Sequence, residues 1–420
     1  MASPTGLLRA LRSRNYRLLF AGQTVSLIGT WMTRLALSWL VYRLTRSAWL
    51  LGVVGFCGQI PMFFLGPIAG VWVDRWNRQK TLLVTQALSM LQSFALAALT
   101  LGGVIQIWHM IALALFQGVV NAVDMPARQS FVIEMVESRD DLPNAIALNS
   151  SMVNATRLIG PAIAGLVIAA IGEGWCFFAD GVSYLAVIAS LWAMHVPRTA
   201  RPARHPRVFA QLAEGWRYVA RSRPIRTLLL LLALVSLVGM PYTVLMPIFA
   251  AGILHGGANT LGFLTGASGV GALLAALLLA MRKTVIGLGT RIAVSCALFG
   301  AALVAFALSR SLWLSLLVLP FTGFGMMQEM ASTNTILQTI VEDDKRGRVM
   351  AYYAMAFQGI APFGSLLAGA ASARIGAPAT LAAGGVLCIA GAAWFAFRLP
   401  SLRELVHPIY VRLGIVPEVS

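Results

Sequence analysis

The chain has 420 residues, of which 58% are hydrophobic and only 11% are charged. This composition differs strongly from that of a soluble globular domain and predicts an integral membrane protein. The formal net charge of +17 does not indicate a nucleic-acid partner, because the basic residues are distributed over alternate loops instead of gathering on one face.

Twelve apolar stretches of the sequence are long enough to cross a lipid bilayer, which takes about 20 helical residues. We expect an all-α polytopic membrane protein with transmembrane helices at roughly 16–42, 49–73, 81–102, 107–127, 144–171, 175–196, 226–250, 259–281, 288–308, 312–338, 349–371 and 377–398. They form two six-helix halves at 1–196 and 226–400, joined by a basic linker at 197–225 and followed by a cytoplasmic tail at 401–420.

The two halves contain related segments. Residues 24–29 have the sequence TVSLIG, and residues 234–239, which lie 210 positions later, have the sequence LVSLVG. A second pair of segments matches at an offset of 205, which makes Asp124 and Glu329 equivalent positions. An apolar chain built from two copies of one half is typical of a secondary transporter, whose substrate site lies between the halves.

The basic residues indicate the orientation of the chain in the membrane. They crowd the amino terminus and every second loop, whereas the intervening loops hold only a few. The crowded positions are Arg9, Arg12, Arg14 and Arg17, then Arg75, Arg78 and Lys80, the linker, then Arg282, Lys283 and Arg291, and finally Lys345, Arg346 and Arg348. This positive-inside pattern predicts cytoplasmic termini, in a bacterial inner membrane.

The first predicted helix has a polar face. Gln23, Ser26, Thr30, Thr33, Arg34 and Ser38 fall on one side of it. A polar stripe of this length cannot face lipid, so it faces a watery cavity or another helix. We count Gln23, Thr30 and Arg34 as candidate cavity residues. Arg34 either lines the substrate path or pairs with a carboxylate or carbonyl oxygen of a neighbouring helix.

The loop after the second predicted helix contains the pattern Gly-x-x-x-Asp-Arg-x-x-Arg, at Gly70, Asp74, Arg75 and Arg78. It resembles the signature loop of the major facilitator superfamily. The resemblance implies that Gly70 makes a close helix contact, that Asp74 faces the amino end of helix eleven, and that a basic residue of the loop bridges to Asp124. Such a network would lock the two halves in one state. The alternative is an ordinary solvated run of charges.

Helix four carries a second polar stripe, at Gln117, Asn121, Asp124 and Arg128. We count Gln117 and Asn121 as candidate cavity residues. Asp124 is a gate element, a proton carrier or half of a fixed ion pair, and we favour the ion pair because basic residues are close by in the sequence.

Helix five carries Arg157, followed by Gly160, Pro161 and Gly165. Small residues let helices approach closely, and a proline can bend the span. Arg157 is a further cavity candidate. Asp180 in helix six is a candidate for proton coupling, but a structural ion pair between Arg157 and Asp180 is an open alternative.

Within the linker, four apolar residues recur at helical spacing, at Phe209, Leu212, Trp216 and Val219. We expect a short amphipathic helix that lies on the cytoplasmic face of the membrane. A contact with a partner protein is the alternative.

Helix ten contains Glu329, which has several methionines beside it and no basic residue within several turns of its own helix. Partial desolvation disfavours the charged form of such a carboxylate, so Glu329 is the better candidate for a proton carrier. Pairing with Arg34 across the predicted cavity is the alternative.

Three further segments resemble one branch of the superfamily, the transmembrane secretion effectors, which includes enterobactin exporters and macrolide-efflux permeases. They are residues 15–17 (NYR), 124–128 (DMPAR) and 346–349 (RGRV). Residues 157–165 (RLIGPAIAG) resemble in part the Gly-Pro motif of the antiporters. The resemblance implies proton-coupled export of a small amphiphilic molecule, such as a siderophore or a drug-like compound. The alternatives are an importer of a small metabolite and a non-transporting receptor or assembly factor.

Other classes of protein lack support in the sequence. There is no Gly-x-x-x-x-Gly-Lys-[Ser/Thr] loop for an ATP-driven pump, and no His/Cys cluster or nucleophile with a base indicates a metal centre or an enzyme. The four cysteines lie singly inside predicted helices, where packing is their expected role. We therefore expect a monomer without cofactors, whose partners are a small-molecule substrate, the lipid bilayer and protons.

Overall fold

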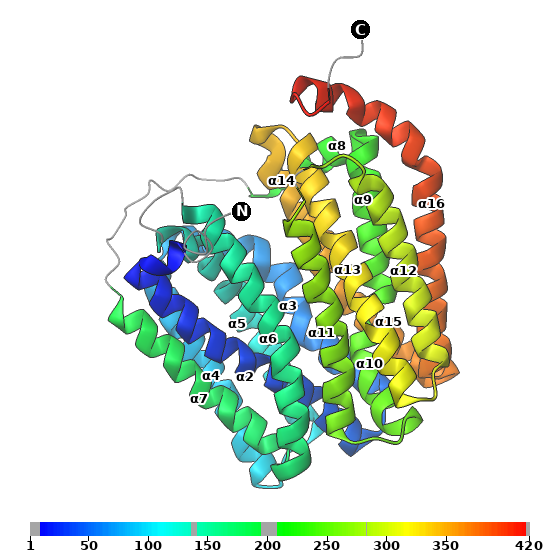
Figure 1. The fold of residues 1–420 in the computed structure, drawn as a ribbon. Helices are drawn as coiled ribbons and strands as arrows, with labels where there is room; N and C mark the ends of the chain where they lie inside the picture. The colour runs from blue at the N-terminus through cyan, green and yellow to red at the C-terminus, as the bar shows by residue number, and fades with distance from the viewer. Residues whose placement is uncertain (1–8, 136–140, 195–207, 283, 417–420) are drawn as a thin grey trace. The chain divides into compact units, whose positions relative to one another are not determined.

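The computed structural model describes residues 9–135, 141–194, 208–282 and 284–416, and all regular structure in these ranges is helical (Figure 1). The elements are η1 (Arg9–Arg12), α2 (Arg14–Thr45), α3 (Ala48–Arg75), α4 (Arg78–Leu101), α5 (Ile107–Glu134), α6 (Leu142–Ile171), α7 (Glu173–Ala193), α8 (Val208–Arg221), α9 (Arg223–Leu234), η3 (Val235–Gly239), α10 (Tyr242–Ile248), η4 (Phe249–Ile253), α11 (Ala258–Ala280), α12 (Leu288–Leu308), α13 (Leu312–Ile340), α14 (Asp343–Ala354), η5 (Met355–Gly359), α15 (Ala361–Ile375) and α16 (Ala377–Arg412). The predicted all-α fold is confirmed.

Eleven helical segments of the described residues are long and apolar enough to cross a membrane. Two of them, 223–253 and 343–375, each join several elements into one span. The 32-residue helix α2 is the twelfth long helix, and its polar face explains why its hydropathy is lower than that of the other spans. The last helix continues to Arg412, well past the predicted end of the span at residue 398.

The chain divides into two compact units. Unit 1 comprises residues 1–206 and 246–269, and unit 2 comprises residues 207–245 and 270–420. Within unit 1, α2 packs against α6 and α7, and α4 packs against α5 and α7 (Figure 1). Within unit 2, α12 packs against α13 and α16.

Two glycines of α2 allow its close contact with α7. A Cβ atom at Gly22 would lie 2.5 Å from the Ser190 Oγ, and one at Gly29 would lie 2.6 Å from the Ser183 Oγ. Helices in a bilayer associate by close packing and interhelical hydrogen bonds, because lipid tails are as apolar as their side chains. The glycines therefore fix where polar residues of α2 and α7 meet.

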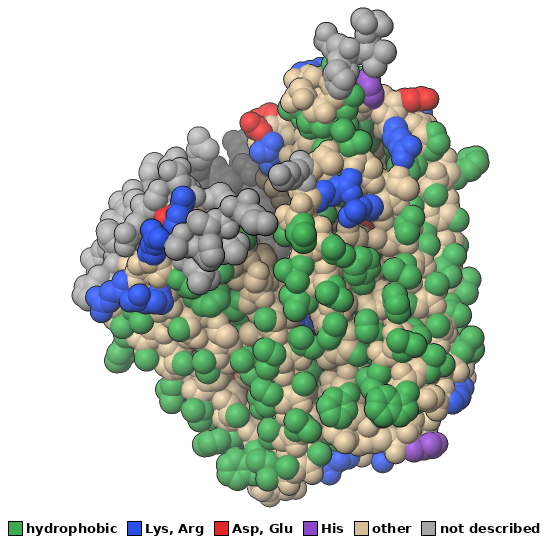
Figure 2. Space-filling model, viewed as in Figure 1, with side chains coloured by type: hydrophobic (Ala, Val, Ile, Leu, Met, Phe, Trp, Pro, Cys, Tyr) green, Lys and Arg blue, Asp and Glu red, His purple; other side chains and the backbone are tan. Residues whose placement is uncertain are grey.

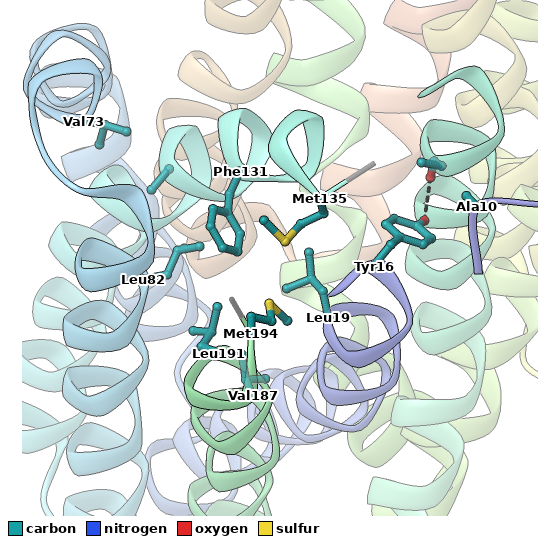
Figure 3. Close-up of a cluster of buried hydrophobic side chains, with 12 residues drawn as sticks. Ala10, Tyr16, Leu19, Val73, Leu82, Phe131, Met135, Val187, Leu191 and Met194 are labelled. Carbon is teal, nitrogen blue, oxygen red and sulfur yellow. Dashed lines mark hydrogen bonds between the residues drawn. The ribbon is translucent and has the colours of Figure 1, made fainter. Parts of the chain in front are cut away.

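A cluster of buried apolar side chains lies between α2, α4, α5 and α7 in unit 1 (Figure 3). The cluster includes Phe131 of α5, Met135 directly after α5, Leu191 of α7 and Tyr16 of α2. The Tyr16 hydroxyl donates a 2.8 Å hydrogen bond to the backbone oxygen of Ala145. This bond satisfies the only polar atom of a side chain that is otherwise enclosed by apolar groups.

The long helices of unit 2 contain π-helical turns, η3 and η5, each followed closely by a proline, Pro241 or Pro362. A proline inside a helix cannot donate to the carbonyl four residues earlier, and its ring collides with that carbonyl. A widened π turn accommodates this collision without ending the helix.

The surface shown in Figure 2 has the distribution of side chains that a bilayer requires. Hydrophobic side chains cover the long sides of the helices, and most Lys and Arg side chains gather near the ends. Apolar residues such as Trp192, Trp313 and Phe397 are 75%, 80% and 88% exposed, as expected where side chains face lipid.

Candidate functional site

A row of buried polar side chains on α4 organises the polar interior of unit 1. Its members are Thr81, Thr85, Gln86, Ser89, Gln92 and Ser93, each at most 8% exposed. This row was not predicted from the sequence, although its spacing of three to four residues marks one face of a helix. Asp124 of α5 and Asp180 of α7 each have a hydrogen-bond partner in this row.

Asp124 of α5 forms the fixed ion pair that the sequence favoured. Its Oδ2 atom accepts from Arg128, one turn along the same helix, with the closer nitrogen at 2.5 Å. Its Oδ1 atom accepts from the Thr85 hydroxyl at 2.7 Å and from the Gln86 amide at 2.8 Å. The carboxylate is 6% exposed, so its charge is compensated inside the protein by one cation and two neutral donors.

The predicted cavity residues of α2 and α5 join this network. Arg128 also donates to the Oε1 of Gln23, which ties α5 to α2. Gln117 donates to the hydroxyl of Ser89 at 3.0 Å and to Asn121 at 3.1 Å. These amides are thus held by protein groups within unit 1.

Asp180 of α7 is buried, with 1% of its surface exposed. Its Oδ2 atom accepts a 2.8 Å hydrogen bond from Ser93 of α4. No described ion pair joins it to Arg157, so the structural pair left open by the sequence is not present. Nearby, the hydroxyls of Thr30 and Tyr184 lie 3.4 Å apart and link α2 to α7.

Two arginines of different helices flank one tryptophan. The guanidinium carbon of Arg34 lies 4.9 Å from the centre of the Trp31 ring, and that of Arg157 lies 5.8 Å from it. Cations at these distances are attracted to the face of the indole. Neither arginine forms an ion pair with a described carboxylate, although the charge of Arg34 also interacts with Asp180.

Glycines of α6 set the position of this cluster. A Cβ atom at Gly160 would lie 2.5 Å from the Cβ of Trp31, so α6 can touch α2 only because residue 160 has no side chain. Farther along α6, Pro161 and Gly165 contact Gly262 of α11 within unit 1. The predicted Gly-Pro motif is therefore a pair of helix contacts, with Arg157 one turn before the first.

The structure does not describe the surroundings of Gly70 or the side chains of Asp74 and Arg75. The lock implied by the loop signature therefore stays a prediction. Arg78, at the start of α4, points to α5 and its Nη1 lies 3.5 Å from the backbone oxygen of Ser130. The described partners of Asp124 are Thr85, Gln86 and Arg128, and all of them lie on α4 and α5.

Unit 2 contains a buried carboxylate of a different kind. Glu329 of α13 is 1% exposed. Its Oε1 atom accepts a 3.4 Å hydrogen bond from Thr333, and its Oε2 atom has no hydrogen-bond partner among the described groups. Gln328 and Ser332, on adjacent turns, also have buried polar atoms without a described partner.

An ion pair that was not predicted from the sequence joins the carboxyl-terminal end of α2 to the amino-terminal end of α7. Arg43 donates to both carboxylate oxygens of Glu173, at 2.7 and 3.3 Å. Arg43 is one of the few basic residues in the sparse loops, and no local pattern links it to a glutamate 130 positions away.

These residues are suited to binding a charged or aromatic ligand and to taking up and releasing a proton. The spans hold two arginines whose charge no described ion pair neutralises, one aromatic ring between them, and a carboxylate without a described basic partner. Among the described residues, no group of three or more His, Cys, Asp or Glu side chains is arranged to hold a metal ion.

Comparison with known proteins decides the family. Residues 5–408 match the family described as transmembrane secretion effector. The chain belongs to this family of the major facilitator superfamily. It is a membrane transporter and not an enzyme.

Relatives of this chain include two transporters whose names give different cargo. The chain is 27% identical to the staphyloferrin A transporter of Staphylococcus aureus, over 83% of this chain and 87% of the relative. It is 26% identical to the multidrug efflux pump Tap of Mycolicibacterium fortuitum, over 92% of this chain and 96% of that pump.

Solved structures of the same fold have much lower sequence identity. The nucleoside transporter NupG superposes with a TM-score of 0.72 at 11% identity, over 91% of this chain and 98% of NupG. A bacterial homologue of the human lysosomal transporter Spinster superposes with a TM-score of 0.70 at 14% sequence identity, over 92% of this chain and 96% of the homologue. These similarities establish the major facilitator fold and nothing about the cargo.

Proposed function

We propose that this transporter exports a small amphiphilic molecule across the bacterial inner membrane in exchange for protons, by alternating access and with both termini in the cytoplasm. The observation that carries the proposal is the state of Glu329. Burying a carboxylate inside a span costs free energy, so such residues usually have a function. No described cation neutralises the charge of Glu329.

The contrast with the other buried acids supports a role for Glu329 in coupling. Asp124 has Arg128 and Glu173 has Arg43, so their charges are fixed by ion pairs. Glu329 receives one long hydrogen bond from a hydroxyl. A proton on Glu329 therefore breaks no described ion pair, which is what a group that loads and releases protons requires. Asp180, which is held by Ser93, is the second candidate.

Substrate recognition is assigned to the cluster of Arg34, Trp31 and Arg157. Arg34 keeps an exposed side chain midway along α2. A guanidinium at this depth would cost about 3 kcal/mol in lipid, so its exposed surface belongs to a water or substrate route. Two cations beside an aromatic ring suit a molecule that combines an anionic group with an apolar or aromatic body.

The names of the relatives agree with this class of cargo, since one transports a siderophore and another exports drugs. Reconstituted proteoliposomes test the energy source. With substrate inside and an imposed pH gradient, the wild type should pump, and uncouplers should stop it. Transport that ignores the gradient but requires ATP would overturn the proposal.

Glu329→Gln is the decisive variant, with Thr333→Val as its matched control. The first removes the titrating group, and the second removes only its hydrogen bond. Glu329→Gln should lose gradient-driven pumping and keep substrate exchange between the two sides, whereas Thr333→Val should keep both. Normal pumping by Glu329→Gln would exclude Glu329 as the carrier. Accumulation of substrate in the same direction as proton flow would favour the importer.

A further inference from the structure

We infer that the connector helix α8 and the start of α14 form a binding pocket for a phosphate group on the cytoplasmic side. The two helices border a partly open pocket of about 260 Å³ in unit 2, and its lining includes Glu214, Arg217, Tyr218, Arg221, Lys345 and Arg348. This inference does not depend on the cargo or on proton coupling.

The pocket is built by specific contacts between the two helices. Gly215 lets α8 approach α14, because a Cβ atom there would lie 3.1 Å from the Tyr352 ring and 3.2 Å from the Cβ of Arg348. Arg348 donates to Glu214 at 2.6 Å. The Lys345 ammonium lies 5.0 Å from the centre of the Tyr218 ring. The walls are therefore fixed by an ion pair and a cation–π contact.

The charge of the pocket is unbalanced. Four of its lining residues are basic and one is acidic, so they carry a net charge of +3. Glu214 is already engaged by Arg348, and Lys345 pairs with Glu342 just outside the pocket. Arg217 and Arg221 have exposed side chains and form no ion pair with a described carboxylate. Two guanidinium groups one turn apart are thus available to an anion.

The donors match a phosphate better than a carboxylate. A guanidinium presents a planar pair of N–H donors that fits phosphate oxygens, and two of them can bind different oxygens of one group. Burial raises the pKa of the Tyr218 phenol, and the nearby Glu342 raises it further, so this hydroxyl stays protonated and can donate as well.

A phosphate group can come from a lipid headgroup or from solution. Trp216 on α8 is 59% exposed and lies beside Tyr352, with ring centres 6.0 Å apart. Exposed tryptophans are typical of the interface between membrane and water, where basic pockets bind anionic headgroups. An occupant would connect α8 to α14, which begins the 343–375 span, and would stabilise unit 2.

Thermal unfolding of the full chain in lipid nanodiscs tests the pocket. The melting temperature is followed while phosphatidylglycerol replaces phosphatidylcholine, and, in pure phosphatidylcholine, while inorganic phosphate is added. A rise with phosphatidylglycerol alone identifies a lipid headgroup, and a saturating rise with inorganic phosphate identifies a soluble ligand. Both results support the pocket, and a lack of response to both overturns it.

The variant Arg217→Gln/Arg221→Gln locates the effect. Its control is Arg291→Gln/Arg412→Gln, which removes two exposed basic residues of unit 2 outside the pocket. Each basic residue contributes about a fivefold gain in affinity for an anionic surface, so the pocket variant should need at least about tenfold more ligand for the same shift. The control should match the wild type.

An equal loss in the two double variants would mean that only the general surface charge acts, and would overturn the inference. If the pocket variant does not fold, Arg217→Gln and Arg221→Gln are measured singly. Each should weaken the response by about fivefold, and wild-type behaviour of both would also overturn it.

Discussion

Asp124 and Glu329 occupy equivalent positions in the two halves of the sequence, yet only Asp124 has an ion-pair partner among the described residues. Both carboxylates are buried. Arg128 and two donors of α4 fix the charge of Asp124, whereas Glu329 has a hydroxyl of its own helix. The two halves therefore have an acidic residue at the same position, but its surroundings differ between them.

Asp124→Asn should destabilise the protein by about 3 kcal/mol, because it leaves the partly buried Arg128 without its anion. Thermal unfolding in detergent measures this loss. Asp343→Asn is the control, since it breaks an exposed pair with Arg346 and should cost less than about 1 kcal/mol. The double variant Asp124→Asn/Arg128→Met should recover part of the stability. Equal effects of the two single variants would contradict the fixed pair.

Trp31→Leu should raise the KM for substrate transport about tenfold, because Arg34 and Arg157 lose the aromatic ring that holds them in place. Trp31→Phe keeps an aromatic face and should raise the KM less. Concentration-dependent uptake into inverted vesicles measures the effect. Trp192→Phe, on the lipid-facing surface, is the control and should transport normally. If Trp31→Leu, Arg34→Gln and Arg157→Gln all leave the KM for transport unchanged, the substrate binds elsewhere.

Gly160→Ala should cost about 1–3 kcal/mol and reduce transport, because the new methyl group collides with the Cβ of Trp31 and pushes α6 away from α2. Gly58→Ala in α3 is matched in chemistry, but its nearest neighbour lies 3.8 Å from the added Cβ. It should be tolerated. Thermal unfolding and vesicle uptake of the two variants, measured side by side, distinguish a tight crossing from a general sensitivity of helical glycines.

Asp74→Asn should shift the resting population toward the inward-facing state if the loop signature acts as a lock. A bias of a few kcal/mol changes such an equilibrium markedly. Cysteine accessibility from each side of the membrane, in a background without the four native cysteines, reports the shift. An unchanged pattern with intact transport would make the loop an ordinary run of charges.

The sequence predicted what depends on a single helix and missed what depends on two. Long apolar stretches predicted the helices, and the basic residues near Asp124 in the sequence predicted an ion pair, whose partner in the structure is Arg128. The polar row of α4 was overlooked because its Thr, Ser and Gln residues carry no charge and the span still has a mean hydropathy of 1.6. The placement of Arg34 and Arg157 on Trp31 needed the crossing of α2 and α6 at Gly160, which no spacing along the chain specifies.

The polar face of α2 also bears on how the protein is made. Helix α2 precedes α6 and α7 along the chain, and it is not among the eleven segments of the described residues that are apolar enough to cross a membrane. Its buried polar residues Gln23 and Ser26 are covered by helices that follow it in the chain, since α2 packs against α6 and α7 and Gln23 accepts from Arg128 of α5. The newly made segment should therefore remain beside the insertion machinery until α7, which ends at Ala193, has been synthesised.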